Sequence, residues 1–301
     1  MNIAFVFPGQ GSQYKDMGKD FYENYPEAKR IYELAEQILG IDIKSICFNA
    51  EINEYTQLAI FITEMAILEV IKSKGIKAEY TSGLSLGEYS AITYGNIISL
   101  ENTIPLIQKR GEYMTKLIEP CKYKMIAVLG LEDSRVKEIC ESIEGFIEPV
   151  NYNCPGQVVI SGEYEIVENS IENFKTVGAK VIPLNVKSAF HTIKLNKAKE
   201  KLYNYLENIE INKPNCKIIK NMDGTEYTDK DNIKEILANH IVQPVYFGKC
   251  IENMIKNGVN TFIEIGPGKT LSGFIKKTNK DVKVINIEKI EDLEKLEEFL
   301  C

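Results

Sequence analysis

The sequence predicts an α/β protein with a parallel sheet and helices on both of its faces. Short apolar stretches alternate with helical patterns along nearly the whole chain, which is typical of a parallel sheet. A denser alternation of short strands and helices interrupts the middle of the chain. The 301 residues, 44% of them hydrophobic and 26% charged, are enough for one large domain or two moderate ones.

Composition argues against several classes of protein. The seven cysteines are odd in number and scattered, without a C-x-x-C pair, so we expect neither a disulfide framework nor a metal site. A net charge of -7 argues against a nucleic-acid partner. No apolar run approaches the ~20 residues that span a bilayer, so no membrane partner is expected. The start MNIAFVFPGQ lacks the features of an export signal, and we expect a cytoplasmic protein.

The larger unit is predicted from segments at both ends of the chain. Its apolar stretches indicate strands at residues 3–7, 80–84, 217–221, 261–266 and 283–288. Helical patterns occur around residues 22–38, 56–72, 86–95, 100–117, 197–206, 232–241, 247–257 and 270–277, with a charged helix at the C-terminus. The helix at 56–72 is apolar on every side, which indicates that it crosses the core.

The middle of the chain predicts a smaller domain inserted into the larger one. Strands are expected at 124–130, 147–153, 157–162 and 179–186, with helices at 132–143 and 163–178. This βαββαβ series is the ferredoxin-like order. We therefore predict a core formed by residues 1–123 and 187–301, with residues 124–186 as the inserted subdomain.

Ser85 stands in the pattern Gly-x-Ser-x-Gly, formed with Gly83 and Gly87. At a strand-to-helix turn this pattern is typical of a nucleophile elbow, in which small neighbours allow strand and helix to approach closely. The serine would then lie at a helix N-terminus, where the N–H group of Leu86 is the natural donor to a developing oxyanion. The pattern also occurs by chance in loops, so Ser85 is either a nucleophile or an ordinary loop residue.

A nucleophilic serine needs a base, and the chain contains only two histidines, His191 and His240. His191 follows the last strand of the predicted subdomain, at a domain junction of the kind where pockets form. His240 lies in a helix that ends before Pro244. A single histidine is more often structural than catalytic, so these observations leave the choice of base open.

Six segments resemble the malonyl-CoA:acyl carrier protein transacylase family, in order and over nearly the whole length. They are FVFPGQGSQ (5–13), GLSLGEYSA (83–91), QKRGEYM (108–114), NCPGQVVISG (153–162), SAFHT (188–192) and EIGPGKTLSGFIKK (264–277). The resemblance implies an α/β-hydrolase-like core with a parallel sheet plus an inserted ferredoxin-like subdomain. It also implies transfer of malonyl from malonyl-CoA to acyl carrier protein, for fatty acid or polyketide synthesis.

The resemblance assigns roles to individual residues. Ser85 would be the nucleophile and His191 the general base of a ping-pong reaction through a malonyl-serine ester. Gln10 and Leu86 would supply the two backbone N–H donors of the oxyanion hole. No cofactor is expected, because the CoA thioester is itself the substrate.

Further roles concern recognition and orientation. Arg110 would hold the malonyl carboxylate, because a guanidinium matches a carboxylate with two parallel hydrogen bonds. Phe190 resembles the form associated with malonyl rather than branched units. Two positions depart from the family pattern: Leu84, where most relatives have histidine, and His240, where glutamine or asparagine is common. The backbone carbonyl of His240 would still orient His191.

Carrier proteins are strongly acidic, so an acidic enzyme needs a local basic surface to bind one. Residues 187–201 contain five lysines and one glutamate. Either this segment is a solvated helix face, or it docks the carrier through Lys194, Lys197, Lys199 and Lys201. We expect a monomer. The rival hypotheses are a hydrolase that clears acyl groups from carriers and a catalytically silent interaction module.

Overall fold

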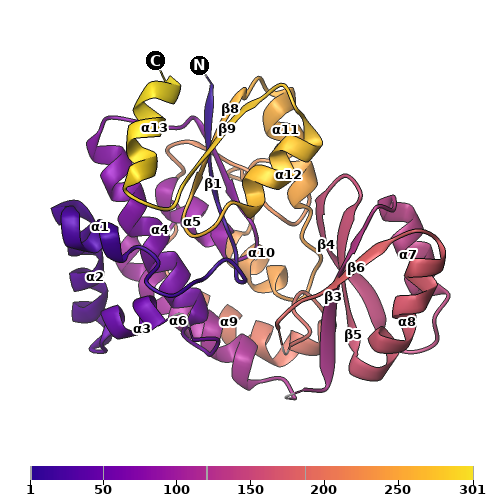
Figure 1. The fold of residues 1–301 in the computed structure, drawn as a ribbon. Coiled ribbons are helices and arrows are strands. Elements are labelled where there is room, and N and C mark those ends of the chain that lie inside the picture. The colour runs from indigo at the N-terminus through magenta and orange to yellow at the C-terminus, as the bar shows by residue number, and fades with distance from the viewer. Residues whose placement is uncertain (1, 50, 120, 187, 301) are drawn as a thin grey trace.

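A computed structural model describes residues 2–49, 51–119, 121–186 and 188–300 (Figure 1). Its larger sheet has the strand order β7-β2-β1-β8-β9, and all neighbouring strands are parallel. The strands are β1 (Ile3–Phe7), β2 (Tyr80–Gly83), β7 (Lys217–Ile218), β8 (Thr261–Ile265) and β9 (Lys283–Ile287). The predicted parallel sheet is confirmed. Because β1 and β2 are parallel neighbours whose last residues, Phe7 and Gly83, are paired, the loops at their carboxyl ends lie side by side.

Helices cover both faces of this sheet (Figure 1). Phe5 and Phe7 of β1 belong to the core formed with α4 (Thr56–Ser73) and α5 (Gly87–Tyr94). Ala4 and Val6 point to the other face, where α11 (Phe247–Lys256) and α12 (Thr270–Thr278) pack. Alternate residues of one strand thus fill two cores.

The remaining helices of the larger unit surround these layers. They are α1 (Lys19–Asn24), α2 (Pro26–Leu39), α3 (Ile43–Asn49), α6 (Leu100–Lys116), the 3₁₀ turn η1 (Ile193–Leu195), α9 (Asn196–Leu206), α10 (Ile233–His240) and α13 (Glu291–Leu300). The prediction of one helix at 22–38 is wrong. The helix is interrupted at the extended residue Tyr25, and α2 begins at Pro26. Proline lacks an N–H and is therefore tolerated at the first helical position. Within the described residues, no helix is long and apolar enough to cross a membrane.

The second sheet is antiparallel, with the order β4-β5-β3-β6. Its elements are β3 (Tyr123–Leu129), α7 (Asp133–Glu141), β4 (Ile147–Cys154), β5 (Gln157–Glu163), α8 (Tyr164–Thr176) and β6 (Lys180–Pro183). The predicted ferredoxin-like order is confirmed, while the division at residues 124 and 186 stays a prediction. One face packs under α7 and α8, and the other turns Met125, Ala127 and Val159 toward the larger unit.

Candidate active site

A cleft of about 280 Å³ lies between the carboxyl ends of β1 and β2 and the open face of the second sheet. Segments far apart in the sequence meet here. The cleft is lined by Pro8, Gly9, Gln10, Gly11, Ser12, Gln57, Leu84, Ser85, Arg110, Met114, Met125, Ala127, Asn151, Asn153, Gln157, Val159, Leu184, Val186, Phe190, His191, Thr270, Leu271 and Phe274. Five residues predicted for the site are therefore brought together: Gln10, Ser85, Arg110, Phe190 and His191.

Ser85 occupies a tight turn between β2 and α5. Its φ of 55° is left-handed, a conformation that a residue with a Cβ adopts at an energetic cost. A Cβ on Gly83 would overlap the backbone of Gly87, and a Cβ on Gly87 would overlap the carbonyl of Phe7. Only glycine fits at these two positions, which is the physical content of the Gly-x-Ser-x-Gly pattern.

His191 contacts the serine directly, since its Nε2 atom lies 2.8 Å from Ser85 Oγ. Its Nδ1 atom lies 2.8 Å from the carbonyl oxygen of His240. A carbonyl can only accept, so Nδ1 carries the proton and Nε2 is left free to accept one from the serine. Of the two histidines, His191 is the one whose ring contacts Ser85. His191 also has a left-handed φ, of 63°, which the sequence did not indicate.

Burial, assisted by the charge of Arg110, lowers the pKa of His191 from 6.5 to about 4. Hydrogen bonds to the backbone of His240 and Gln243 oppose this shift only in part. The imidazole is therefore neutral, and able to act as a base, far below its usual range.

This shift predicts the pH dependence of serine acylation. Since the neutral imidazole is the active form, the rate should stay level from about pH 8 to about pH 5 and fall through about pH 4. The same depressed pKa stabilises the folded state above pH 6.5, and this contribution is lost between pH 6.5 and about 4. Rapid-quench measurement of the acyl-enzyme against pH checks the first statement, and a midpoint near 6.5 would contradict it.

Two backbone N–H groups stand beside the serine. Among the described residues, the N–H groups of Leu86 and Gln10 have no hydrogen-bond acceptor. Leu86 starts the first turn of α5, and Gln10 follows β1, the neighbour of β2 in the sheet. The side chain of Gln10 accepts a hydrogen bond from Gln57 Nε2 at 3.2 Å. These two groups are available to a developing oxyanion, and their role as its donors stays a prediction.

Arg110 on α6 is 1% exposed, and its guanidinium lies beside Ser85. Its Nη2 atom donates to Ser85 Oγ at 3.2 Å, Nη1 donates to the side-chain oxygen of Gln57, and the group lies over the ring of Tyr89. Among the described residues, no carboxylate lies within ion-pair distance of Arg110. Burial lowers the pKa of Arg110, which nevertheless remains charged at neutral pH.

The side chain of His240 adds a second buried imidazole. Its Nε2 atom lies 3.4 Å from Glu88 Oε2, without hydrogen-bond geometry. Burial lowers the pKa of His240 well below 6.5 and raises that of Glu88 to about 7. The imidazole of His240 is therefore neutral. Histidine at this position departs from the family pattern, but the backbone carbonyl of residue 240 still contacts His191.

Sequence reasoning missed three polar groups that support the site: Gln57, Glu88 and Asn221. Glu88 is a carboxylate on a buried helix, and an acidic residue in an otherwise apolar or small-residue segment is only a weak indication of a functional site. Gln57 stood in an apolar helix, and Asn221 lay at the end of a short strand. Neither position has a sequence pattern that would mark it.

Comparison with known proteins places this geometry in a family. The model of the family described as "Acyl transferase domain" matches residues 4–296. The chain belongs to the acyl transferase family.

The acyltransferase has close curated and structural relatives. It is 40% identical over 301 residues to the malonyl CoA-acyl carrier protein transacylase of Bacillus subtilis, covering 97% of this chain and 95% of the relative. The crystal structure of the enzyme of that name from Clostridium perfringens superposes with a TM-score of 0.96 at 43% identity, covering 100% and 97% of the two chains.

Another solved structure similar to the acyltransferase contains a partner. It is a type II PKS acyl-carrier protein in complex with its malonyl-transacylase, with a TM-score of 0.94 and 30% identity, covering 99% of both chains. The α/β-hydrolase-like core with a ferredoxin-like subdomain, predicted from the sequence, is the fold of these neighbours.

Proposed function

We propose that this acyltransferase moves the malonyl group of malonyl-CoA to the phosphopantetheine thiol of an acyl carrier protein, through a malonyl ester of Ser85. The names of its relatives support the donor and the acceptor. The supporting geometry is the contact between Ser85 Oγ and His191 Nε2. We further propose that the enzyme works in the cytoplasm as a monomer and needs no resident cofactor.

In the first half-reaction, Ser85 Oγ attacks the thioester carbonyl while His191 Nε2 takes the hydroxyl proton. The new C–O bond forms a tetrahedral oxyanion that the N–H groups of Gln10 and Leu86 stabilise. The C–S bond then breaks, and His191 returns the proton to the sulfur of the departing CoA. The carbonyl of His240 holds the imidazolium during this step, because it accepts from Nδ1 at 2.8 Å.

In the second half-reaction, the carrier thiol takes the place of CoA. Its sulfur attacks the ester carbonyl, and His191 accepts the thiol proton. When the C–O bond breaks, the proton passes to Ser85 and the free serine is restored. Each half-reaction is the reverse of the other in its proton transfers, which is the ping-pong pattern.

Arg110 is the observation that favours a malonyl donor. Burying a charge without a partner is costly, and a fold retains such a group where a ligand completes the pair. Its Nη2 atom already lies 3.2 Å from the nucleophilic oxygen, so a carboxylate one carbon beyond the reacting carbonyl is within reach. Phe190 completes the wall of the cleft on the side of His191.

Intact-mass analysis after mixing with malonyl-CoA and then carrier protein tests the proposal. A malonyl adduct on Ser85 that moves to the carrier is the expected result. Rapid release of malonate without transfer would instead favour the hydrolase, and no adduct with no turnover would favour the silent module. A matched acetyl-CoA sample, which lacks the carboxylate, serves as the control for donor choice.

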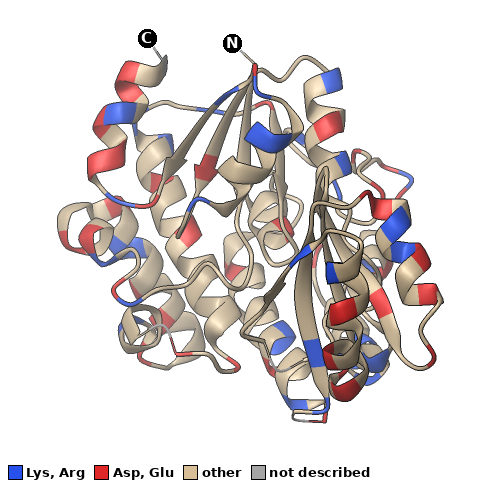
Figure 2. Ribbon diagram, turned by 45° about the vertical axis from the view of Figure 1, so that its right-hand side comes forward, with Lys and Arg blue, Asp and Glu red and all other residues tan. Residues whose placement is uncertain are grey.

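The four lysines proposed to dock the carrier lie just beyond His191. Lys197 and Lys201 are exposed on α9, whereas Lys194 and Lys199 are half-buried. Lys194 lies over the ring of Phe146, 4.3 Å from its centre, and so also links the two units. Lys187, the fifth lysine of the segment, lies outside the described residues. Since acidic and basic residues are mixed over the outer helices (Figure 2), a local positive segment is needed to guide an acidic carrier.

Reversing the two exposed charges, with Lys197→Glu and Lys201→Glu together, should raise KM for the carrier roughly tenfold. Acylation by malonyl-CoA alone should not change, because these side chains do not line the cleft. Lys29→Glu on α2, a comparable exposed reversal elsewhere on the core, is the control. Steady-state kinetics with varied carrier measures the effect, and an unchanged KM would rule out docking at these lysines.

A further inference from the structure

Asn221 is completely buried, three residues beyond β7, and its side chain reaches the elbow. Its Oδ1 atom accepts from the backbone N–H of Ser85 at 2.7 Å. Its Nδ2 atom donates to the carbonyl of Gly83 at 2.7 Å. The side-chain amide of Asn221 thus bridges the turn from Gly83 to Ser85.

These contacts fix the orientation of the amide. A flipped side chain would set an NH₂ group against the N–H of Ser85 and an oxygen against the carbonyl of Gly83. Both backbone groups would then lose these bonds, and buried backbone groups are costly to leave unpaired. Because Asn221 occupies the N–H of Ser85, the oxyanion is left to the N–H groups of Leu86 and Gln10.

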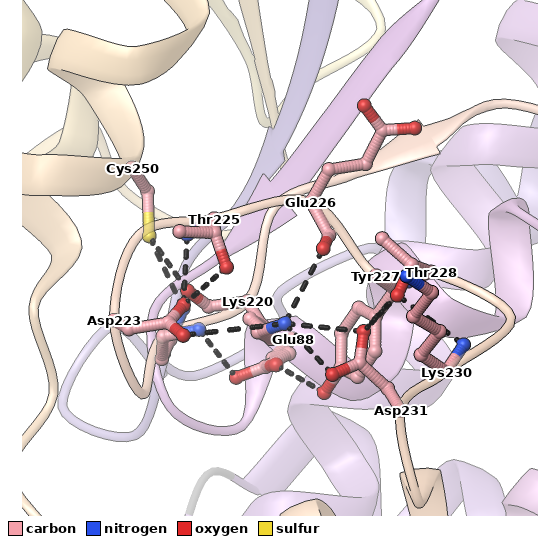
Figure 3. A network of polar contacts seen from close by, with 11 residues as sticks. Glu88, Lys220, Asp223, Thr225, Glu226, Tyr227, Thr228, Lys230, Asp231 and Cys250 are labelled. Atoms are coloured by element: carbon pink, nitrogen blue, oxygen red, sulfur yellow. Dashed lines mark hydrogen bonds and ion pairs between the residues drawn. The ribbon is translucent and has the colours of Figure 1, made fainter.

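Asn221 is itself held from several sides. Its N–H donates to Glu88 Oε2 at 3.2 Å. Glu88 Oε1 in turn accepts from the hydroxyl of Tyr227 at 2.6 Å (Figure 3). Its carbonyl accepts from the N–H of Tyr246 at 2.8 Å. The preceding residue, Lys220, is paired with Asp231 at 3.1 Å. The amide is therefore a fixed strut rather than a mobile contact.

We propose that Asn221 is a positioning residue of the acylation reaction, which holds Ser85 in its left-handed conformation so that Oγ stays aligned with His191. The proposal rests on Ser85 being the nucleophile. The left-handed turn places Oγ 2.8 Å from His191 Nε2, and nothing in the local sequence other than the two flanking glycines favours this conformation. Without the strut the turn can relax, and a displacement of about 1 Å can cost about 100-fold in rate.

Asn221→Ala should therefore lower the rate constant of serine acylation about 100-fold, while KM for malonyl-CoA changes less than about threefold. Rapid-quench intact-mass analysis with malonyl-CoA measures the adduct directly, and Ser85→Ala sets the zero. If wild type forms no adduct, the proposed function fails. If wild type forms one and Asn221→Ala matches its rate, the positioning role alone fails.

Ser82→Ala is the matched control for a merely structural role. Ser82 lies in β2 and donates to the carbonyl of Ile219 at 2.9 Å, so it joins the same two segments without touching a reacting group. Its loss should lower the midpoint temperature of thermal unfolding and leave the acylation rate constant unchanged. An equal loss of rate in Ser82→Ala and Asn221→Ala would overturn the proposal.

Asn221→Asp provides a readout that a structural role would not move, and it keeps the side-chain shape if Asn221→Ala fails to fold. A protonated carboxyl reproduces both bonds, with one oxygen accepting from Ser85 and the O–H donating to Gly83. The ionised form cannot donate, and burial near Glu88 raises the pKa of the new group. The rate relative to wild type should therefore recover as pH falls.

This pH series uses the ratio to wild type at each pH, so any pH dependence that the two proteins share cancels. The ionisable groups around position 221 are Glu88, Tyr227, Cys250 and Lys220. Glu88 couples with the new carboxyl, so the ratio reports the titration of that pair. His191 stays neutral to about pH 4, so the base remains active throughout. A ratio that does not vary with pH would overturn the proposal.

Discussion

Ser85→Ala is expected to lower malonyl transfer by on the order of 10⁴-fold or more, because it removes the oxygen that carries the acyl group. His191→Ala should cost a similar factor, because no other described base lies within hydrogen-bond reach of Ser85 Oγ. The double variant should be scarcely worse than either single variant, since the two residues act as one unit. Transfer of radiolabelled malonyl to carrier protein measures all three.

Alanine at position 85 keeps the Cβ and removes only the hydroxyl, so the backbone conformation should not change. Thermal unfolding of the variants confirms that the comparison is between folded proteins. A malonyl adduct on Ser85→Ala, or a double variant whose loss is the product of the two single losses, would contradict the assignment of this pair.

Arg110→Ala has the second largest expected effect, and it acts on the choice of donor. Losing a buried charge partner costs about 2–5 kcal/mol, so kcat/KM for malonyl-CoA should fall at least about 30-fold. Acetyl-CoA has no carboxylate to lose, and its kcat/KM should hold or rise. The ratio of the two values is therefore the informative measurement.

This ratio also separates selectivity from a general effect on the base. The charge of Arg110 helps to lower the pKa of His191, so removing it raises that pKa and changes both donors alike. Arg110→Lys keeps the charge but not the planar pair of donors, and it should recover only part of the preference. An unchanged malonyl-to-acetyl ratio in Arg110→Ala would refute the clamp.

The sequence predicted the site where its chemistry depends on local pattern. Gly83 and Gly87 are required because a Cβ at either position would overlap neighbouring backbone atoms. The turn could therefore be predicted from Gly83, Ser85 and Gly87 alone. The chain has only two histidines, so the candidates for the base were His191 and His240. The alternation of strand and helix patterns predicted both sheets. The break before Pro26 was missed, although a proline at that point favours the start of a new helix.

Other parts of the site could not be predicted, because they depend on long-range contacts. Asn221 lies 136 residues from Ser85 and reaches it only because β7 pairs with β2. The contact from the carbonyl of His240 to His191 was predicted only through the family resemblance, because a backbone group leaves no mark on the side-chain pattern. Gln57, beside Arg110, belongs to a helix whose apolar pattern indicated only burial.

The left-handed backbone of the dyad bears on how this protein can evolve. Five described non-glycine residues have positive φ, and Ser85 and His191 are two of them. Each such position costs a residue with a Cβ about 1 kcal/mol, so glycine would be accepted at both if only folding mattered. Glycine at either position would relieve the backbone strain but would remove the proposed nucleophile or the proposed base. The proposed chemistry therefore limits which stabilising substitutions positions 85 and 191 can accept.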